Sequence, residues 1–240
     1  MNIETIPNDA AAAAASWRPM SFGLRPARQV DNPVVEPAWG GTRVLVLVRG
    51  DTVEARDEYG TEQAIREELR EALVAALDAT GTATALIDGH LTPAVVKDTT
   101  GIAMGFEVLD ELRPSDVGRQ MLMGSRGRRD RRRDRLEADL ARRERPPVDE
   151  PVGLVAIDLL WIDDDPLIDV PLLERKRLLE AAVRESDLVR ISAHVRPPIE
   201  AWYGQWRAFG FHEVAVRDAN SRYRPGEHSD AWATALIPRR

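Results

Sequence analysis

The chain has 240 residues, of which 43% are hydrophobic and 30% charged, and its formal net charge is -7. This composition is typical of a folded globular protein and excludes an intrinsically disordered chain, and no apolar stretch approaches the roughly 20 residues that a membrane helix needs. The sequence contains no cysteine, which excludes disulfides and thiolate metal sites, and the N-terminus lacks the pattern of a secretory signal. We therefore expect a cytoplasmic protein without a membrane partner.

Charge is distributed unevenly along the chain. The segment from Arg126 to Arg145 contains ten arginines against five acidic residues, so it carries about +5 and the remainder about -12. The basic residues are almost all arginines, since only Lys97 and Lys176 of the 33 are lysines. The arginine-rich segment predicts either a solvated helix or loop, or a nucleic-acid-binding module that contacts phosphates.

The first half of the chain predicts a tail, a hairpin and a helix. Residues 1 to 30 combine an alanine run with scattered prolines, which favours a disordered or extended N-terminal tail. Residues 43–48 and 52–56 flank a turn at Arg49-Gly50-Asp51 and predict a β-hairpin. Apolar residues at helical spacing predict a helix over 62–78, and residues 83–87 predict a strand.

The second half predicts further helices interleaved with short strands. An arginine-rich insertion is expected at about 115–148, and Pro146-Pro147 ends it. We expect strands at 154–157, 188–195, 213–217 and 231–237, and helices at 172–183 and 198–209. This order predicts an α+β domain over residues 31–240.

Five blocks of sequence carry a resemblance when they are taken together and in order. They span roughly residues 34 to 237 and are Glu36-Pro-Ala-Trp-Gly-Gly-Thr-Arg43, Ile87-Asp-Gly-His90, Val155-Ala-Ile-Asp-Leu-Leu-Trp-Ile-Asp163 through Pro171-Leu-Leu-Glu-Arg-Lys-Arg-Leu-Leu-Glu180, Gly210-Phe-His-Glu-Val-Ala-Val-Arg217, and Ser221-Arg-Tyr-Arg-Pro-Gly-Glu-His-Ser-Asp-Ala-Trp232. The first block resembles the signature E-x-K-[YW]-D-G-x-R, and the last resembles S-x-Y-x-P-G…S-x-x-W. The chain thus resembles the adenylation (nucleotidyltransferase) domain of ATP-dependent DNA ligases.

This resemblance implies a fold and a nucleotide pocket. The implied fold is the one shared by DNA ligases and mRNA-capping enzymes, with antiparallel sheets flanked by helices; because the chain stops at Arg240, we expect no oligonucleotide-binding barrel. The implied function is that of an ATP-dependent ligase-like protein of DNA repair or recombination, and the implied cofactors are ATP and Mg²⁺. The pocket positions that the resemblance implies are Glu36, Ala38, Trp39, Arg43, His90, Ile157, His212, Arg217 and Thr234.

The residue that should carry the chemistry differs from the family pattern. The family's first step is attack by a lysine amine on the α-phosphate of ATP, and Ala38 stands at that position. Arginine cannot replace the amine, because its guanidinium stays protonated. Lys97 and Lys176 fall in other parts of the predicted fold, so we expect no catalytic residue and an inactive enzyme.

Other pocket positions also depart from the family. His90 and His212 replace the two carboxylates that the family uses to hold Mg²⁺, and Ile157 replaces the aromatic residue that stacks on adenine. The two lysines expected after Trp232 align with Thr234 and Leu236. Mg²⁺ prefers oxygen ligands. We therefore expect no metal site, with zinc on His90 and His212 as the alternative.

Three hypotheses follow from these patterns. The first is a pseudo-adenylation domain kept for binding a nucleotide, DNA or a DNA-repair protein. The second is residual ligase or nucleotidyltransferase activity through another nucleophile, such as His90 or His212. The third is nucleic-acid binding by the arginine-rich segment, for which the candidate residues are Arg126, Arg128, Arg129, Arg131, Arg132 and Arg133.

Overall fold

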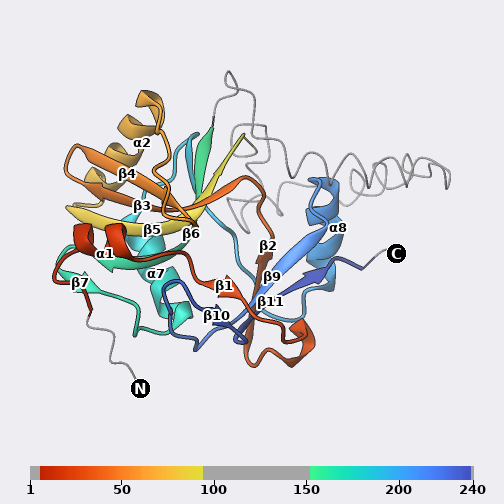
Figure 1. Cartoon of the computed structure of the whole chain (residues 1–240). Coiled ribbons are helices and arrows are strands. Elements are labelled where there is room, and N and C mark those ends of the chain that lie inside the picture. The colour runs from red at the N-terminus through yellow and green to blue at the C-terminus, as the bar shows by residue number, and fades with distance from the viewer. Residues whose placement is uncertain (1–5, 94–151, 239–240) are drawn as a thin grey trace.

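A computed structural model describes residues 6–93 and 152–238 of the chain. The arginine-rich segment proposed at about 115–148, with its candidate residues, lies outside the described residues, as does Lys97. In the described part, Figure 1 shows two groups of elements side by side: one around the strands β3 to β7, the other around β2, β9 and β11.

The described elements alternate between helices and short strands. In chain order they are α1 (Ala10–Ser16), β1 (Ser21–Phe22), the 3-10 helix η1 (Ala27–Gln29), β2 (Pro33–Pro37), β3 (Thr42–Arg49), β4 (Thr52–Asp57), α2 (Glu67–Asp78), β5 (Thr84–Thr92), β6 (Gly153–Ile162), β7 (Asp165–Pro166), α7 (Leu172–Ala182), β8 (Val189–Ile191), α8 (Glu200–Ala208), β9 (Glu213–Asp218), β10 (His228–Ser229) and β11 (Trp232–Leu236).

Two sheets organise these elements. The large sheet has the order β4-β3-β5-β6-β7 with antiparallel neighbours, and β8 pairs in parallel with β6. The small sheet is antiparallel with the order β11-β9-β2, and β1 and β10 form a separate parallel pair. None of the sheets built by the described residues closes on itself. The α+β class that the sequence predicts is confirmed.

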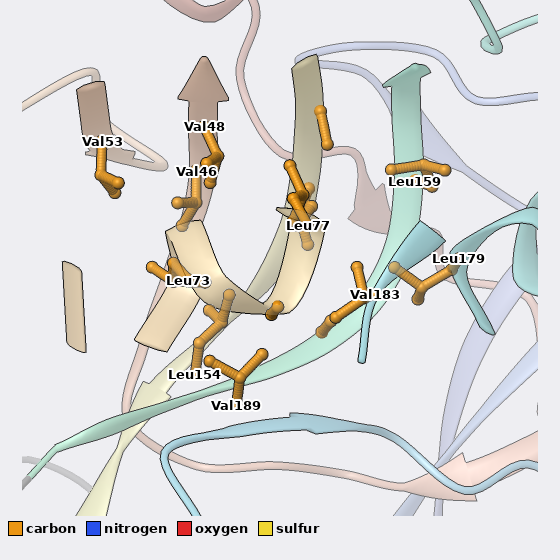
Figure 2. Packing of buried hydrophobic residues seen from close by; sticks show 14 of the residues in the cluster. Val46, Val48, Val53, Leu73, Leu77, Leu154, Leu159, Leu179, Val183 and Val189 are labelled. Atoms are coloured by element: carbon orange, nitrogen blue, oxygen red, sulfur yellow. The ribbon is translucent and has the colours of Figure 1, made fainter. Parts of the chain in front are cut away.

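The two faces of the large sheet are covered by different helices, and the side chains of β3 point alternately to one face and the other. Successive side chains of a strand point to opposite faces: Val44, Val46 and Val48 belong to a core cluster with α2 and α7, part of which Figure 2 shows. Leu45 and Leu47 pack on the other face, with α1. The continuous apolar run of β3 therefore reflects burial on both faces.

The prediction of a tail over residues 1–30 is wrong for the part that the structure describes. Asp9 caps α1 by accepting a hydrogen bond from the Ala12 amide at 2.7 Å, and Ala13, Trp17 and Met20 are buried against the large sheet. Alanine carries little hydrophobic periodicity, but its small side chain and high helix propensity let a helix backbone lie close to a sheet. The alanine run is thus part of the core.

The other predicted elements are present, with shifted boundaries. The helix expected over 62–78 begins only at Glu67, and the strand expected over 83–87 continues to Thr92. This extension places Asp88 and His90 within β5. Asp88 is buried and paired with Arg43, so it does not mark the end of the strand. In the described ranges no helix is long and apolar enough to span a membrane.

Candidate functional site

Three charged side chains meet where the small sheet approaches the large one. Glu36 on β2 accepts a hydrogen bond from Arg217 Nη1 on β9 at 2.8 Å, and the same oxygen, Oε1, lies 2.7 Å from Lys176 Nζ on α7. Lys176 also donates to the Ile157 carbonyl of β6 at 2.8 Å. The three side chains are buried, so this charge cluster joins β2, β9, α7 and β6.

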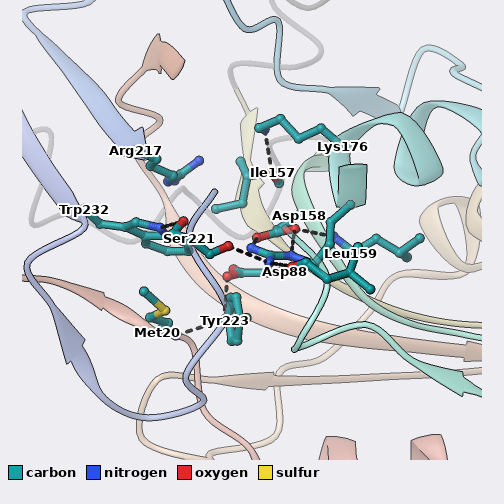
Figure 3. Close-up of polar contacts among 12 residues, drawn as sticks. Met20, Asp88, Ile157, Asp158, Leu159, Lys176, Arg217, Ser221, Tyr223 and Trp232 are labelled. Carbon is teal, nitrogen blue, oxygen red and sulfur yellow. Dashed lines mark hydrogen bonds and ion pairs between the residues drawn. The ribbon is translucent and has the colours of Figure 1, made fainter. Parts of the chain in front are cut away.

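Two further buried carboxylates beside the cluster each form a bidentate ion pair with an arginine. Asp88 on β5 accepts hydrogen bonds from Arg43 Nε at 3.1 Å and Nη2 at 2.7 Å. The Tyr223 hydroxyl donates to the same carboxylate at 2.7 Å. Asp158 on β6 takes Arg175 Nε at 2.9 Å and Nη2 at 2.7 Å. Figure 3 shows Asp88, Asp158 and Tyr223 facing one another below Arg217 and Lys176.

Trp232 connects the cations of the two sheets. Its ring lies 4.7 Å from the guanidinium carbon of Arg217 and 5.8 Å from that of Arg43, measured to the ring centroid. Its indole nitrogen donates to Ser221 Oγ at 3.0 Å, and Trp232 is completely buried. A cation over an aromatic face is attracted by the ring quadrupole, so Trp232 holds both arginines without neutralising either.

The electrostatics of this region follow from burial against opposite charge. Burial raises the pKa of Glu36, but Lys176 and Arg217 outweigh it and bring the pKa to about 2, from the usual 4.5. Burial and the positive charge of Arg43 lower the pKa of His90 to about 3. Burial and Lys176 also lower the pKa of His194. At neutral pH the carboxylate is therefore ionised and both imidazoles are neutral.

Three buried polar atoms of this region have no hydrogen-bond partner. They are Glu36 Oε2, Arg217 Nε and His90 Nδ1. A buried polar atom without a partner costs about 1–3 kcal/mol, which a water molecule or a ligand atom would recover. Glu36 Oε2 and Arg217 Nε belong to the charge cluster itself, so the cluster can form further hydrogen bonds with a ligand.

The remaining predicted pocket residues differ in their burial and in their contacts. Ala38 follows β2 directly and is partly exposed, and Thr234 is exposed on β11. Trp39 donates its indole nitrogen to Ser192 Oγ at 2.9 Å and meets the Phe211 ring edge-on at 5.0 Å. Ile157 is buried in the apolar cluster that also contains Trp39 and Trp206. Of the nine predicted positions, Glu36 and Arg217 are brought into direct contact.

The two histidines offered as a zinc alternative occupy different environments. His90 lies on β5 with its Nδ1 buried, whereas His212 is exposed just before β9. Among residues 6–93 and 152–238, no group of three or more His, Cys, Asp or Glu side chains is arranged to hold a metal ion. Because Asp88, Asp158 and Glu36 are engaged by cations, the residues present do not fit Mg²⁺, which prefers free oxygen ligands.

Lys176 is the site residue that sequence reasoning placed elsewhere. On α7 the buried residues are Leu172, Arg175, Lys176, Leu179 and Ala182, a spacing of three, one, three and three that forms one helical face. Lys176 therefore occupies a position of the buried face, and its ammonium is carried inward to Glu36. That spacing was visible in the sequence, since Arg175 and Lys176 stand where an apolar face would place leucines.

A family model described as "ATP dependent DNA ligase domain" matches residues 28–234. Together with the open two-sheet fold and the order of the motifs, this match defines the class of protein. The chain belongs to the ATP-dependent DNA ligase domain family.

Relatives within this family match only part of the chain. The DNA ligase of Thermococcus fumicolans is 28% identical over 86 residues, which are 34% of this chain and 15% of the relative. DNA ligase 2 of Methanosarcina mazei is 31% identical over 90 residues, or 34% of this chain and 16% of the relative. The matched segment thus spans less than a fifth of either ligase.

Solved structures extend the likeness to nearly the whole chain. The ligase domain of M. tuberculosis LigD superposes with a TM-score of 0.55 at 20% identity, covering 92% of this chain and 59% of that one. A mycobacterial DNA ligase D complexed with ATP and MES gives a TM-score of 0.56 at 23% identity, covering 90% and 58%. At this level of identity the likeness establishes the fold.

Proposed function

We propose that this domain binds an adenine nucleotide without forming the covalent lysine–AMP intermediate, so that it serves as a catalytically inactive adenylation domain. The observation that carries the proposal is Ala38, which stands directly after β2 where the family resemblance expects the nucleophilic lysine. A methyl group offers no electron pair to the α-phosphate. Action on DNA, or attachment to a DNA-repair protein, would then depend on this binding role.

The one lysine among the described residues does not replace the missing amine. A nucleophilic amine must be neutral, and Lys176 Nζ lies 2.7 Å from a Glu36 carboxylate whose pKa of about 2 keeps it ionised. Lys176 also donates a hydrogen bond to the Ile157 carbonyl. Its ammonium is therefore held in place by structural contacts.

Nucleotide binding is supported by the free hydrogen-bonding capacity of the cluster. Glu36 Oε2 accepts but cannot donate while Glu36 is ionised, so it matches the exocyclic amino group of a base. Arg217 Nε is a free donor that matches a phosphate oxygen. Both atoms belong to buried side chains of the small sheet, and the pocket positions Ala38 and His90 are partly exposed.

The covalent step is tested with ATP labelled at its α-phosphate, followed by denaturing electrophoresis. We expect no label on the wild-type chain, with or without Mg²⁺, because no described amine is free to attack. Label on the wild type would contradict the proposal. The variants Lys176→Arg, His90→Gln and His212→Gln would then show which side chain carries it.

A further inference from the structure

The buried charges of the site do not balance. Four cations, Arg43, Arg175, Lys176 and Arg217, face three carboxylates, Glu36, Asp88 and Asp158. All of these side chains are fully buried or nearly so; Arg43 has the most exposed side chain, at 13%. Tyr223 and His90 add no charge at neutral pH, since the pKa of the Tyr223 hydroxyl is raised by burial and Asp88, and that of His90 is lowered by burial and Arg43. The described site thus holds one more positive than negative charge.

The surplus is located at Arg217. Arg43 and Arg175 each have a carboxylate to themselves, held through two nitrogens. Lys176 and Arg217, by contrast, share the single oxygen Oε1 of Glu36. Arg217 Nε remains buried without a partner, and the guanidinium rests on Trp232 and Phe22, which do not carry charge.

A site with this balance repels divalent cations and attracts anions. Five of the six carboxylate oxygens are engaged by arginine or lysine, which leaves Glu36 Oε2 alone and too few oxygen ligands for a metal ion. The unpartnered Arg217 Nε can only donate. Arg217 and Lys176 share one carboxylate oxygen, so the two cations are only partly compensated and an anion that enters here gains the attraction that a second carboxylate would supply. Phosphate oxygens are suited to a guanidinium donor.

We infer that the site binds the phosphate of a nucleotide without a divalent cation, and that Arg217 supplies the charge that Mg²⁺ provides in a metal-dependent site. This inference rests on the proposed function and deepens it by specifying the ionic form of the ligand. Mg²⁺ neutralises two charges of ATP, so a cation-rich site binds the free nucleotide at least as well as the magnesium complex.

The test is the thermal unfolding midpoint of the whole chain with ATP, in excess EDTA and in excess Mg²⁺. A ligand that binds only the folded state raises the midpoint, so we expect ATP to raise it in EDTA by at least as much as in Mg²⁺. A rise that needs Mg²⁺ overturns this inference and leaves nucleotide binding intact. No rise under either condition overturns the proposed function as well.

Two further ligands separate the phosphate from the base. Adenosine carries the base alone and tripolyphosphate the anion alone, each measured in EDTA. We expect adenosine to raise the midpoint less than ATP, and tripolyphosphate to raise it as well. An adenosine effect equal to that of ATP would show that the phosphate is not recognised and would overturn the inference.

A variant that cancels the surplus provides the structural control. His90→Glu adds a negative charge next to Arg43 and Arg217, and it should reduce the ATP effect in EDTA and make the remaining effect depend on Mg²⁺. Ala15→Glu makes the same change of net charge on the exposed side of α1 and should leave the ATP effect unchanged. An equal response of both variants, or an undiminished effect in His90→Glu, would overturn the assignment of the surplus to this site.

Discussion

At the scale of single residues, Glu36 is the group on which the site depends, because two buried cations share one of its oxygens. The family resemblance pointed to Glu36 and Arg217 as pocket positions, but as neighbours of a ligand. Sequence could not show that they pair with each other, since they are 181 residues apart. Nor could the resemblance supply Lys176, which completes the cluster from a helix.

Replacing Glu36 by glutamine tests this dependence through pH. The folded-state pKa of Glu36 is about 2 against 4.5, so its contribution is complete above pH 4.5 and is lost as pH falls toward 2; one unit corresponds to about 1.4 kcal/mol. We expect Glu36→Gln to lower the free energy of unfolding by about 3 kcal/mol at pH 7. The difference from wild type should shrink below pH 4.5, as followed by urea unfolding at each pH.

The matched control for this prediction is Glu54→Gln on β4, where the side chain is exposed. It should stay close to the wild type across the whole pH range, because an exposed charge contributes little. A deficit of Glu36→Gln that is the same at pH 7 and pH 3 would contradict the assigned pKa.

At the scale of elements, sequence was informative where the hydrophobic pattern was periodic and misleading where it was not. The β3–β4 hairpin and α7 were predicted nearly to their ends, since a continuous apolar run before a turn and helical spacing both report burial directly. β5 was predicted too short, because Asp88 and His90 look like a polar strand end until their partners are known. α1 was missed altogether, since seven small residues, six of them alanine, define no apolar face.

The packing of α1 is tested by enlarging one alanine at a time. Ala13 is fully buried and Ala15 is exposed on the same helix. We expect Ala13→Leu to lower the free energy of unfolding by about 1–3 kcal/mol through overpacking, and Ala15→Leu to leave it nearly unchanged in the same urea titration. Equal effects of the two substitutions would mean that residues 10–16 do not dock on the sheet.

At the scale of the whole molecule, Lys176 joins the two sheets that the family fold places side by side. Its ammonium contacts Glu36 on the small sheet and the Ile157 carbonyl on the large one. Besides this cluster, β2 is tied to the segment after β8 by mutual backbone hydrogen bonds between Val35 and Val195, both 2.9 Å. The small sheet has three strands against the six of the large sheet, so we expect it to open before the large sheet does.

Lys176→Met retains most of the side chain's volume and removes the ammonium, with its ion pair to Glu36 and its hydrogen bond to the Ile157 carbonyl. Glu36 keeps Arg217 as its cation, but the buried Ile157 carbonyl loses its donor, which costs about 1–3 kcal/mol. Amide hydrogen exchange should accelerate first in β2 and β9, while β3 and β5 keep their protection. Arg177→Met is the control, because that arginine is exposed on the same helix and pairs only with Glu174, so its exchange pattern should match the wild type. Equal acceleration in both sheets of Lys176→Met would show that the two sheets unfold as one unit and that the ammonium does not set their relative stability.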